Sequence, residues 1–474
     1  MTLRSTLALL LIASAPALAQ PAKTPPPAPA KAPAPTAPDD MQAFDKELDA
    51  LFTQGGLTSD QAAAAAVKVS PSVQRSVAEI EVAIAQAEAA ELSRVPQVSA
   101  KAAYTRLSPI DPFILTLPGG GGEFAIQSFE NVYTVQGQVG IAVSDYFLRY
   151  PKLIDAARLA AQVSKISRHS SELNAGQEAR SAYYEWVRAK LQVLIAERQL
   201  AQVQTTLKQV RALAEVQRLS RADLMRVESN EAQADQAVIQ LRHLASLREE
   251  QLRLIIGAPD GQALTVGEDI RTVVAAPDSA QLDALMETAK KQRLDFRVLD
   301  TGIAAKEKQR AAEKAGLYPR LSAFGAAEYT NPNQRVFPQE EKFSFTWSVG
   351  AQVTWALNDA LISNTTDKRL RGETNELRAD RATLERGTRI QVLAAQQAVE
   401  IAQAALSTSQ KGLAAAEEGY RVRRELLNAE RATAVELVDA ETDLTRARIA
   451  SLNAKVDLRV ALTELSHALG NDAK

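Results

Sequence analysis

The acidic residues Glu436 and Asp439 lie three positions apart near the C-terminal end of the sequence. They fall at the start of a predicted helix, where an i, i+3 spacing puts both carboxylates on one side. Repeated around the axis of an oligomer, such residues form acidic rings that select cations and bind divalent ions. We therefore interpret Glu436 and Asp439 as a cation-selective constriction, with Asp223 near the start of an earlier predicted helix as a further candidate.

Capping is the simpler role for acids at helix starts. Thr433, followed three residues later by Glu436, fits the capping-box motif, which marks a helix start after a turn. Ser220 followed by Asp223 resembles the same motif, so capping explains Asp223 as well as a gate does. Asp439 lies beyond the N3 position, and a cap does not require it. Three arginines close to the two turns are expected to help hold the constriction shut: Arg218, Arg221 and Arg431.

Nothing else in the sequence has the pattern of a catalytic or cofactor site. The histidines His169, His243 and His467 fall in separate predicted helices, without the paired spacing of a metal site. The chain has no cysteine, which excludes disulfides and thiolate-bound metals. Lys and Arg total 55 against 57 Asp and Glu, so no excess of positive charge points to nucleic acid. The sequence predicts no enzyme, no cofactor, no metal site and no nucleic-acid partner.

Long helices are expected to position these residues. Residues 151–216 form one helical pattern that would be ~100 Å long, whereas 220–256 and 58–95 reach only ~55 Å each. The two shorter helices are expected to stack end to end along the long one. Apolar residues alternate at spacings of three and four, the 3.5-residue period of coiled coils. This period is sustained in three segments: 186–214, 392–420 and 437–468.

Four strands are predicted between the helices. Residues 343–355 alternate strictly between apolar and polar, 133–144 repeat the pattern, and 98–104 and 321–329 are fainter versions. Such alternation with aromatic residues at strand ends is typical of strands that face lipid on one side and a polar lumen on the other. The alternative is a half-buried sheet in a soluble protein. The residues expected in a lipid-facing girdle are Tyr133, Phe343, Trp347 and Trp355.

These strands carry a prediction about assembly. The mature chain has no run of 18 or more apolar residues, so any membrane span is expected to be a barrel. Four strands cannot close a membrane barrel, which needs about eight. Two chains would supply eight strands and three chains twelve. The polar, Gly- and Pro-containing loops 108–131 and 331–342 suit the extracellular side.

The chain is also an internal repeat. Residues 70–96 align with 293–319, and 220–257 align with 433–470 at an offset of 213. Each half is predicted to run helix, strand, strand, long helix, helix, which indicates a duplicated half and not a short solenoid unit. The predicted organisation is a signal peptide, a Pro/Ala-rich disordered linker with an N-terminal segment, a first repeat, a connecting segment, a second repeat and a short tail: 1–19, 20–57, 58–257, 258–280, 281–470 and 471–474.

The N-terminus explains the first two of these boundaries. Arg4, the apolar run 7–12 and the small residues of Ala17-Leu18-Ala19 have the layout of a secretory signal peptide. Residues 21–38 are almost wholly Pro, Ala, Lys and Thr, a composition that cannot bury a core. Ordered structure is expected to begin between Asp40 and Leu57. The mature protein is therefore predicted to leave the cytoplasm.

From residue 58 to 470 the chain resembles the TolC family of outer-membrane efflux proteins. Residues 432–441, Ala-Thr-Ala-Val-Glu-Leu-Val-Asp-Ala-Glu, resemble the family's Arg-Thr-x-x-Asp-Val-Leu-Asp-Ala signature, and 222–224 resemble its Thr-Asp-Val. The resemblance implies a homotrimer with a 12-stranded barrel and a periplasmic α-barrel. It also implies a periplasmic adaptor and an inner-membrane transporter as partners. The family's usual Gly before the signature is replaced here by Gln217 and Glu430, and its Arg by Ala432.

The sequence therefore predicts a mainly α protein with a membrane β-barrel part, built from duplicated halves with long antiparallel coiled-coil helices. It is expected in the outer membrane, extending into the periplasm. Its predicted function is the exit duct of a tripartite efflux pump or a type I secretion system. The alternative is a soluble periplasmic coiled-coil scaffold or adaptor, which would purify without detergent. Drugs, metals and secreted proteins are all open as cargo.

Overall fold

The computed structural model describes eight stretches of the chain: residues 46–111, 113–116, 123–126, 128–217, 219–259, 261–272, 281–429 and 431–473. It divides the chain into two units, 1–45 and 46–474. The predicted signal peptide and most of the Pro/Ala-rich segment lie outside the described residues. Residues 46–51 are helical and lead into the first strand, so the structure is described from within the range expected for its start.

Each half of the chain has the predicted order of helix, strand, strand, long helix and helix, with small elements added. The first half contains β1 (Phe52–Leu57), α2 (Ser59–Val69), α3 (Pro71–Leu92), β2 (Gln97–Arg106), β3 (Phe113–Thr116), β4 (Glu123–Ile126), β5 (Asn131–Ile141), α4 (Asp145–Leu148), α5 (Tyr150–Glu215) and α6 (Arg221–Ile256). The second contains α7 (Leu282–Gln292), α8 (Leu294–Glu313), the 3₁₀ helix η1 (Lys314–Leu317), β6 (Arg320–Asn331), β7 (Ser344–Thr354), α9 (Leu357–Asn428), α10 (Ala434–Leu469) and the 3₁₀ helix η2 (Asn471–Ala473).

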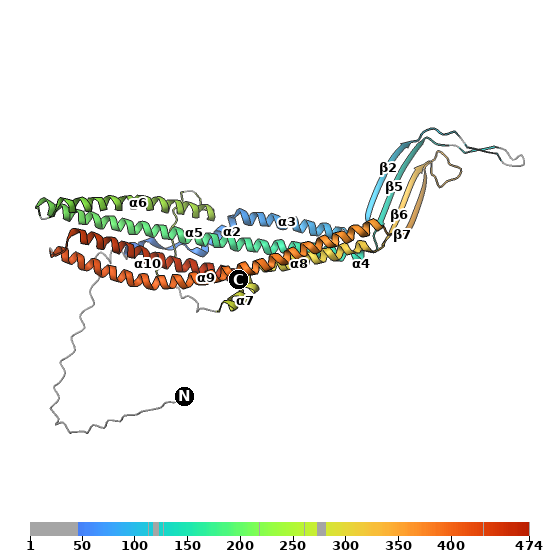
Figure 1. Ribbon diagram of the computed structural model, residues 1–474. Coiled ribbons are helices and arrows are strands. Elements are labelled where there is room, and N and C mark those ends of the chain that lie inside the picture. Colours follow the sequence, from blue (N-terminus) through green and yellow to red (C-terminus); the bar gives the residue numbers. More distant parts are fainter. Residues whose placement is uncertain are drawn as a thin grey trace, which may run out of the picture. The chain divides into compact units, whose positions relative to one another are not determined.

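The four long strands form one antiparallel sheet in the order β2-β5-β6-β7 (Figure 1). The predicted alternation sets its register, because apolar residues face one another across strands: Tyr104 is opposite Tyr133, and Val135 is opposite Tyr329. On β7 the apolar residues are exposed and the polar ones are half-buried over most of the strand. The sheet therefore presents an uncovered apolar face, while β2 and β7 are its two edges.

Two levels of helices continue from the sheet. Next to it, α3, α5, α8 and α9 pack in that order; farther away the order is α6, α5, α10 and α9. The long helices α5 and α9 pass through both levels, and α2 contacts both α3 and α6 (Figure 1). The segment predicted as one helix, 58–95, is divided into α2 and α3 by Ser70 and Pro71, because proline cannot continue a hydrogen-bonded helix. These two helices and α6 share the length of α5, as the sequence predicted for the two segments. None of the described helices has the combined length and apolar character of a bilayer-spanning segment.

Helix ends follow local rules that the repeat duplicates. The return helices α6 and α10 have 36 residues each. Both begin at a hydroxyl N-cap, Ser220 or Thr433, and both end at a left-handed glycine, Gly257 (φ 64°) or Gly470 (φ 73°). A left-handed residue at this position ends a helix and satisfies its last carbonyls, and glycine adopts it without steric cost.

Candidate functional site at the hairpin turns

The turns between α5 and α6 and between α9 and α10 lie together at the end of the helices opposite the sheet (Figure 1). A small apolar cluster joins the two turns, and α5, α6 and α10 contribute its buried residues. Its buried members are Leu207, Val210, Val227, Ala434 and Val438. The cluster brings the predicted constriction residues of both repeats to one place. We call this end, residues 207–227 and 423–439, the tip.

Capping accounts for part of the chemistry at the tip. The Thr433 hydroxyl accepts from the Glu436 backbone N–H at 3.3 Å, and the Thr433 N–H donates to the Glu436 carboxylate at 3.4 Å. This is the complete capping box that the sequence predicted. Ser220 accepts from the Asp223 N–H at 3.1 Å and donates its hydroxyl to the Asp223 carboxylate at 2.6 Å. The Asp223 carboxylate is thus bound within its own cap.

The two acids of the predicted constriction each have an arginine partner in the same chain. Glu436 accepts from Arg423 of α9 at 3.0 Å, and Asp439 lies 3.5 Å from Arg226 of α6. Glu436 therefore contacts its own hairpin, α9–α10, whereas Asp439 contacts the other hairpin, α5–α6. All four side chains are between 44% and 61% exposed, so these ion pairs are open to water.

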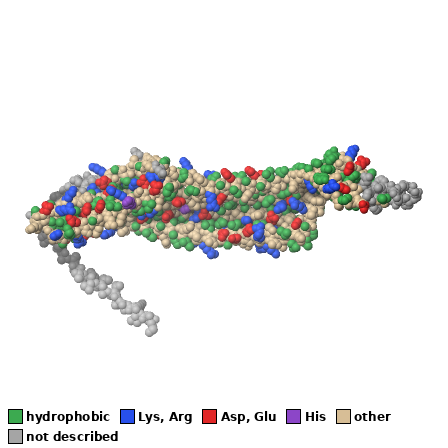
Figure 2. All heavy atoms as spheres, turned by 90° about the horizontal axis from the view of Figure 1, so that it is seen from above, with side chains coloured by type: hydrophobic (Ala, Val, Ile, Leu, Met, Phe, Trp, Pro, Cys, Tyr) green, Lys and Arg blue, Asp and Glu red, His purple; other side chains and the backbone are tan. Residues whose placement is uncertain are grey.

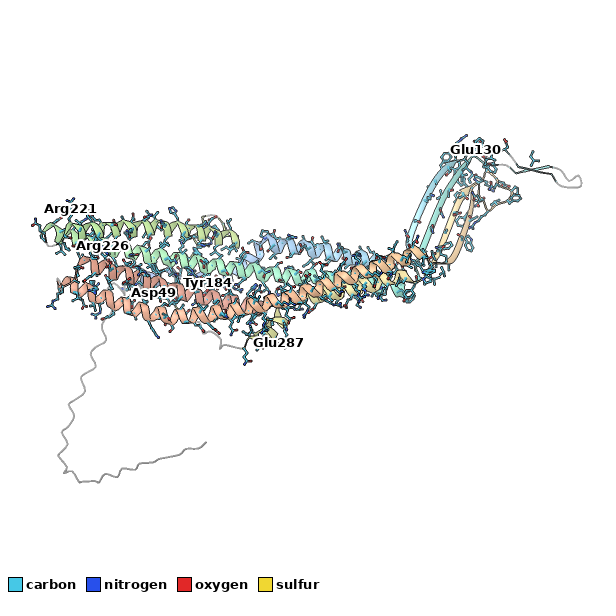
Figure 3. All side chains as sticks on the ribbon, viewed as in Figure 1. Asp49, Glu130, Tyr184, Arg221, Arg226 and Glu287 are labelled. Carbon is cyan, nitrogen blue, oxygen red and sulfur yellow. The ribbon has the colours of Figure 1, made fainter. Side chains whose placement is uncertain are left out.

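The arginines singled out in the sequence have different positions. Arg218 lies outside the described residues, and within the described part of the tip neither Arg221 nor Arg431 forms an ion pair with Glu436 or Asp439. Sequence reasoning missed Arg226 and Arg423. A signal for Arg226 was present, because it is the repeat mate of Asp439 at the offset of 213. Equivalent positions with opposite charges thus meet between the two hairpins (Figure 3 labels Arg221 and Arg226).

The first turn contains a strained residue. Gln217, which stands where the resembled family has glycine, has φ 57° and is the only non-glycine residue with positive φ among the described stretches. Its N–H donates to the Ala214 carbonyl at 3.0 Å and helps to end α5. A left-handed conformation of such a residue costs on the order of 1–3 kcal/mol. The turn therefore holds Gln217 in this conformation, although a glycine at the same position would relieve the strain.

The predicted girdle residues lie on the exposed apolar face of the sheet. Trp347 and Trp355 are 67% and 58% exposed, and Tyr133 and Phe343 about 40%. Tyr133 lies 6.2 Å from Phe343 at the outer end, whereas Trp355 follows β7 at the helical end. Eight residues of strand separate the two tryptophans by ~27 Å along β7. At the ~40° tilt of barrel strands this is ~20 Å along the membrane normal, which fits within the ~25 Å apolar band of a membrane barrel. In Figure 2 hydrophobic side chains gather on the visible face of the sheet end, whereas charged ones are spread along the helices.

No metal or catalytic constellation accompanies these features in the part of the chain that is described. No group of three or more potential ligands comes close enough to hold a metal ion there. His169 contacts Glu172 at 3.1 Å, and His467 contacts Asp472 at 2.6 Å. These histidines lie on different helices, α5 and α10. Each contacts an acidic residue three or five positions farther along the chain.

Comparison with known proteins gives a family match and a fold. Residues 285–471 match the family model described as outer membrane efflux protein. The structure is similar to that of CusC, with a TM-score of 0.73 and 15% identity over 89% of this chain and 93% of that chain. It is also similar to the open state of the Neisseria gonorrhoeae MtrE outer membrane channel (TM-score 0.72, 17% identity, 88% and 89%) and to the Campylobacter jejuni CmeC outer membrane channel (0.71, 13%, 96% and 94%). No curated protein sequence matches the chain significantly.

Proposed function

We propose that this chain, whose second repeat belongs to the outer membrane efflux protein family, is one protomer of a trimeric exit duct. The predicted fold is confirmed: long helices and a four-stranded sheet, arranged as in solved outer-membrane channels. The family is one of transport proteins, not of enzymes. The protein lies in the outer membrane and extends into the periplasm, where its helices form the lower part of the duct.

The main support for a trimer is that the sheet and both levels of helices have an uncovered edge on each side. The sheet ends in the unpaired strands β2 and β7, and α9 lies at one edge of both helical levels, with α3 and α6 at the other. Apolar residues are exposed on the edge helices, including Ile390 and Ile401 on α9 (69% each) and Leu254 on α6 (74%). A head-to-tail contact between opposite edges generates a ring. Three copies would close twelve strands and twelve helices per level.

Native mass spectrometry in detergent tests the trimer. The expected particle contains three chains, because four strands per chain cannot close a membrane barrel alone. A matched variant, Ile390→Asp together with Ile401→Asp, places charge on one edge only and should lower the trimer fraction. A wild-type protein that is a stable monomer or dimer in native detergent would count decisively against the ring.

The exposed apolar face of the sheet favours a membrane protein over a periplasmic scaffold. Val349, 76% exposed on β7, lies on the apolar face between Trp347 and Trp355 and is expected to contact lipid. Arginine costs about 2–4 kcal/mol at mid-bilayer and less towards an interface. Val349→Arg should therefore impair membrane assembly, measured by heat-modifiable migration of the trimer. Its neighbour Ser348 lies on the opposite face, so Ser348→Arg is the control and should assemble. Equal assembly of both variants would favour a soluble sheet.

The partners that complete the duct are a periplasmic adaptor and an inner-membrane transporter. Support comes from the family match and from the free tip, which is the end of the molecule farthest from the sheet (Figure 1). Substrates would pass from the transporter through the helical tube and the barrel to the outside. Cross-linking in cells from a photoreactive residue at Val216, 62% exposed at the first turn, should capture the adaptor. The same residue placed at Leu254, far from the tip, should not.

The acids of the tip form the proposed constriction. Glu436 and Asp439 would supply two stacked acidic rings per trimer, with Asp223 nearby in its cap. Within a chain their charges are balanced by Arg423 and Arg226, and Arg218, Arg221 and Arg431 remain candidates for links between neighbouring tips. The arginines neutralise part of the negative charge of the two rings, so they are expected to reduce the cation selectivity that the carboxylates provide.

Single-channel recording in planar bilayers tests the constriction. Glu436→Gln with Asp439→Asn should reduce cation selectivity and weaken block by divalent ions. The converse variant, Arg423→Gln with Arg226→Gln, removes the arginine partner of each carboxylate and should raise cation selectivity. If the first variant keeps the wild-type selectivity and divalent block, the constriction lies elsewhere in the duct.

A further inference from the structure

A hollow of about 850 Å³ lies where the polar face of the sheet meets the helices, next to α4 and α8 in Figure 1. The strand residues that line it come from the polar face of the four long strands: Gln97, Gln138, Ser322, Gln352 and Thr354. The first turns of α5 and α9 and the end of α8 complete its wall. Small-molecule sites usually have roughly 300–1,000 Å³. In the proposed duct the polar face of the sheet lines the lumen, so this hollow opens onto the path of the substrate.

One side of the hollow is an aromatic ring on an otherwise polar face. Phe324 of β6 is the only aromatic residue at the polar-face positions of the four described long strands. Its cross-strand neighbours are both glycines, Gly140 and Gly350. A Cβ on Gly350 would lie 2.7 Å from the Phe324 ring, so the ring lies directly over the backbone of β7. The half-buried ring thus gives the hollow an apolar surface where strand alternation would place a polar side chain.

Tyrosine side chains from the helical side line the same hollow. Tyr146 and Tyr150 lie edge to face, with ring centroids 5.3 Å apart. The Tyr146 hydroxyl donates to the Arg94 carbonyl, which holds that ring in place. Tyr318, just before β6, is 61% exposed. The faces of aromatic rings carry a negative potential and attract cations. Together with Phe324, these rings give the hollow apolar walls that favour positive charge.

The charges around the hollow leave one carboxylate without a partner. Arg320 donates to the buried Asp145 carboxylate at 2.7 Å, and Arg149 lies 3.5 Å from Glu313. Asp359, in the first turn of α9, is exposed and forms no ion pair with another described residue. Three acids and two arginines therefore line the hollow, and both arginines are already paired. The excess charge is negative and lies beside aromatic walls.

We propose that this hollow is a binding station for organic cations that carry aromatic rings, and that three copies of it surround the base of the barrel lumen. The proposal rests on the proposed function and assigns it a substrate class. The rings of the substrate contact Phe324, and its positive charge lies near the tyrosines and Asp359. Aromatic anions meet the excess negative charge and bind less well. Binding is expected to be weak, because a substrate in transit must also leave.

Fluorescence titration of the detergent-solubilised trimer with ethidium, an aromatic cation, tests the binding station. Phe324→Leu keeps an apolar side chain over Gly350 but removes the ring, and it should weaken ethidium binding by about 5-fold to 30-fold. The control Phe345→Leu removes an exposed ring from the opposite, apolar face of β7 and should leave the affinity unchanged. Equal affinities in the wild type and in Phe324→Leu would overturn the proposal.

A second variant and a competition experiment test the charge of the hollow. Asp359→Asn should weaken ethidium binding by about 3-fold, and by less in high salt, because an exposed charge is screened. The control Asp380→Asn changes an exposed acid of the same helix that does not line the hollow, and it should have no effect. Tetraphenylphosphonium should displace ethidium, whereas tetramethylammonium, a cation without rings, should not. Equal displacement by both cations would contradict the proposal. If Phe324→Leu does not assemble, these measurements decide.

Measurements on the wild type and on a tip variant separate this inference from the one on which it rests. Trimer formation and a measurable wild-type conductance are established first, and failure at that step counts against the exit duct. The tip acids also attract cations, so the double variant Glu436→Gln with Asp439→Asn is titrated as well and should keep the wild-type affinity for ethidium. A conducting trimer whose affinity falls in the tip variant, but not in Phe324→Leu or Asp359→Asn, counts against the binding station alone.

Discussion

The two helical hairpins of this protein are built to one length but are buried differently. The helix α5 ends at Glu215, 74 residues after the end of β5. The helix α9 ends at Asn428, also 74 residues after the end of β7. The return helices are also equal, at 36 residues each. Yet α10 buries a polar set that includes Glu441, Arg448 and Arg459, whereas every buried residue of α6 is apolar.

Position in the protomer accounts for this difference. On the tip side α10 lies between α5 and α9, so side chains around most of its circumference meet another helix. In contrast, α6 packs chiefly against α5 and leaves a face uncovered. Duplication thus preserved length and caps, while the neighbours of each helix determined which residues could become buried. The uncovered face of α6 is the one that the proposed trimer would cover.

The largest expected effect comes from a pair of repeat mates in the return helices. Leu452 on α10 is 8% exposed, and its mate Ile239 on α6 is 50% exposed. Leu452→Ala should cost about 2–5 kcal/mol through lost packing and a cavity. Ile239→Ala in a dissociated chain should change stability by less than about 0.5 kcal/mol. Urea unfolding in detergent measures both, and similar costs in the dissociated chain would contradict the difference in burial.

Alanine substitutions of the two helix-ending glycines should differ less in their cost to stability than the pair Leu452→Ala and Ile239→Ala. A Cβ on Gly470 would lie 2.9 Å from the backbone nitrogen of Arg293, whereas a Cβ on Gly257 would meet the side chain of Val69 at the same distance. Both positions have positive φ, which costs an L-residue about 1–2 kcal/mol. Gly257→Ala should cost about that amount and Gly470→Ala more, because a side chain moves aside more easily than backbone. Thermal unfolding checks the order, and a larger loss for Gly257→Ala would reverse it.

The caps of the return helices should show a difference of about 1 kcal/mol or less. Thr433→Ala removes the hydroxyl that accepts from the Glu436 N–H but keeps the reciprocal bond, which the Thr433 backbone N–H donates. Ser220→Ala removes both hydroxyl bonds to Asp223 and leaves no reciprocal bond. Loss of an N-cap typically costs ~1 kcal/mol, so Ser220→Ala should be the more harmful. Asp223→Glu would supply the reach for a complete box in the first hairpin and should be slightly stabilising. Hydrogen exchange of the first turn of each helix is the measurement.

The smallest predicted effect is a response to acid that distinguishes the halves next to the sheet. In the second half, hydrogen bonds from Arg310 and Lys306 lower the pKa of Asp367 and of Glu373. A carboxylate with a lowered pKa stabilises the fold above its usual pKa, and that stabilisation is lost as pH falls through the lowered value. Below about pH 4 the α8–α9 contact should therefore loosen first, seen as faster hydrogen exchange in 294–313.

The first half supplies the control for that experiment. There α3 packs on α5 through a cluster of small apolar residues: Ala83, Ala87 and Ala161. Apolar contacts do not titrate, and the Glu91–Arg158 ion pair at the end of α3 is exposed, so exchange in 71–88 should change less between pH 7 and pH 3. Equal acceleration in both segments would mean that the ion pairs of α8 and α9 contribute nothing specific.

The sequence by itself was enough to predict the features set by local spacing. Thr433 and Glu436 fix a helix start because their bonds span three residues, and Gly470 fixes its end for the same reason. The strict alternation of 343–355 determines which face of β7 is apolar, since side chains in a strand point alternately to its two faces. The heptad spacing predicted long helices, and the repeat predicted that each half has the same elements. These are all short-range or periodic properties of the chain.

Only the tertiary structure decided which charges meet. Glu436 binds Arg423 and Asp439 contacts Arg226, two arginines that the sequence did not single out, because helices pair by their facing surfaces and not by sequence distance. The burial of Arg459 against Glu268 was equally hidden, since 191 residues separate them and nothing in either local pattern marks them. An ion pair between helices depends on their register and relative rotation. Those quantities are set by the packing of the whole protomer, so the charge pairs at the tip and the Glu268–Arg459 pair could be assigned only after the helices were placed.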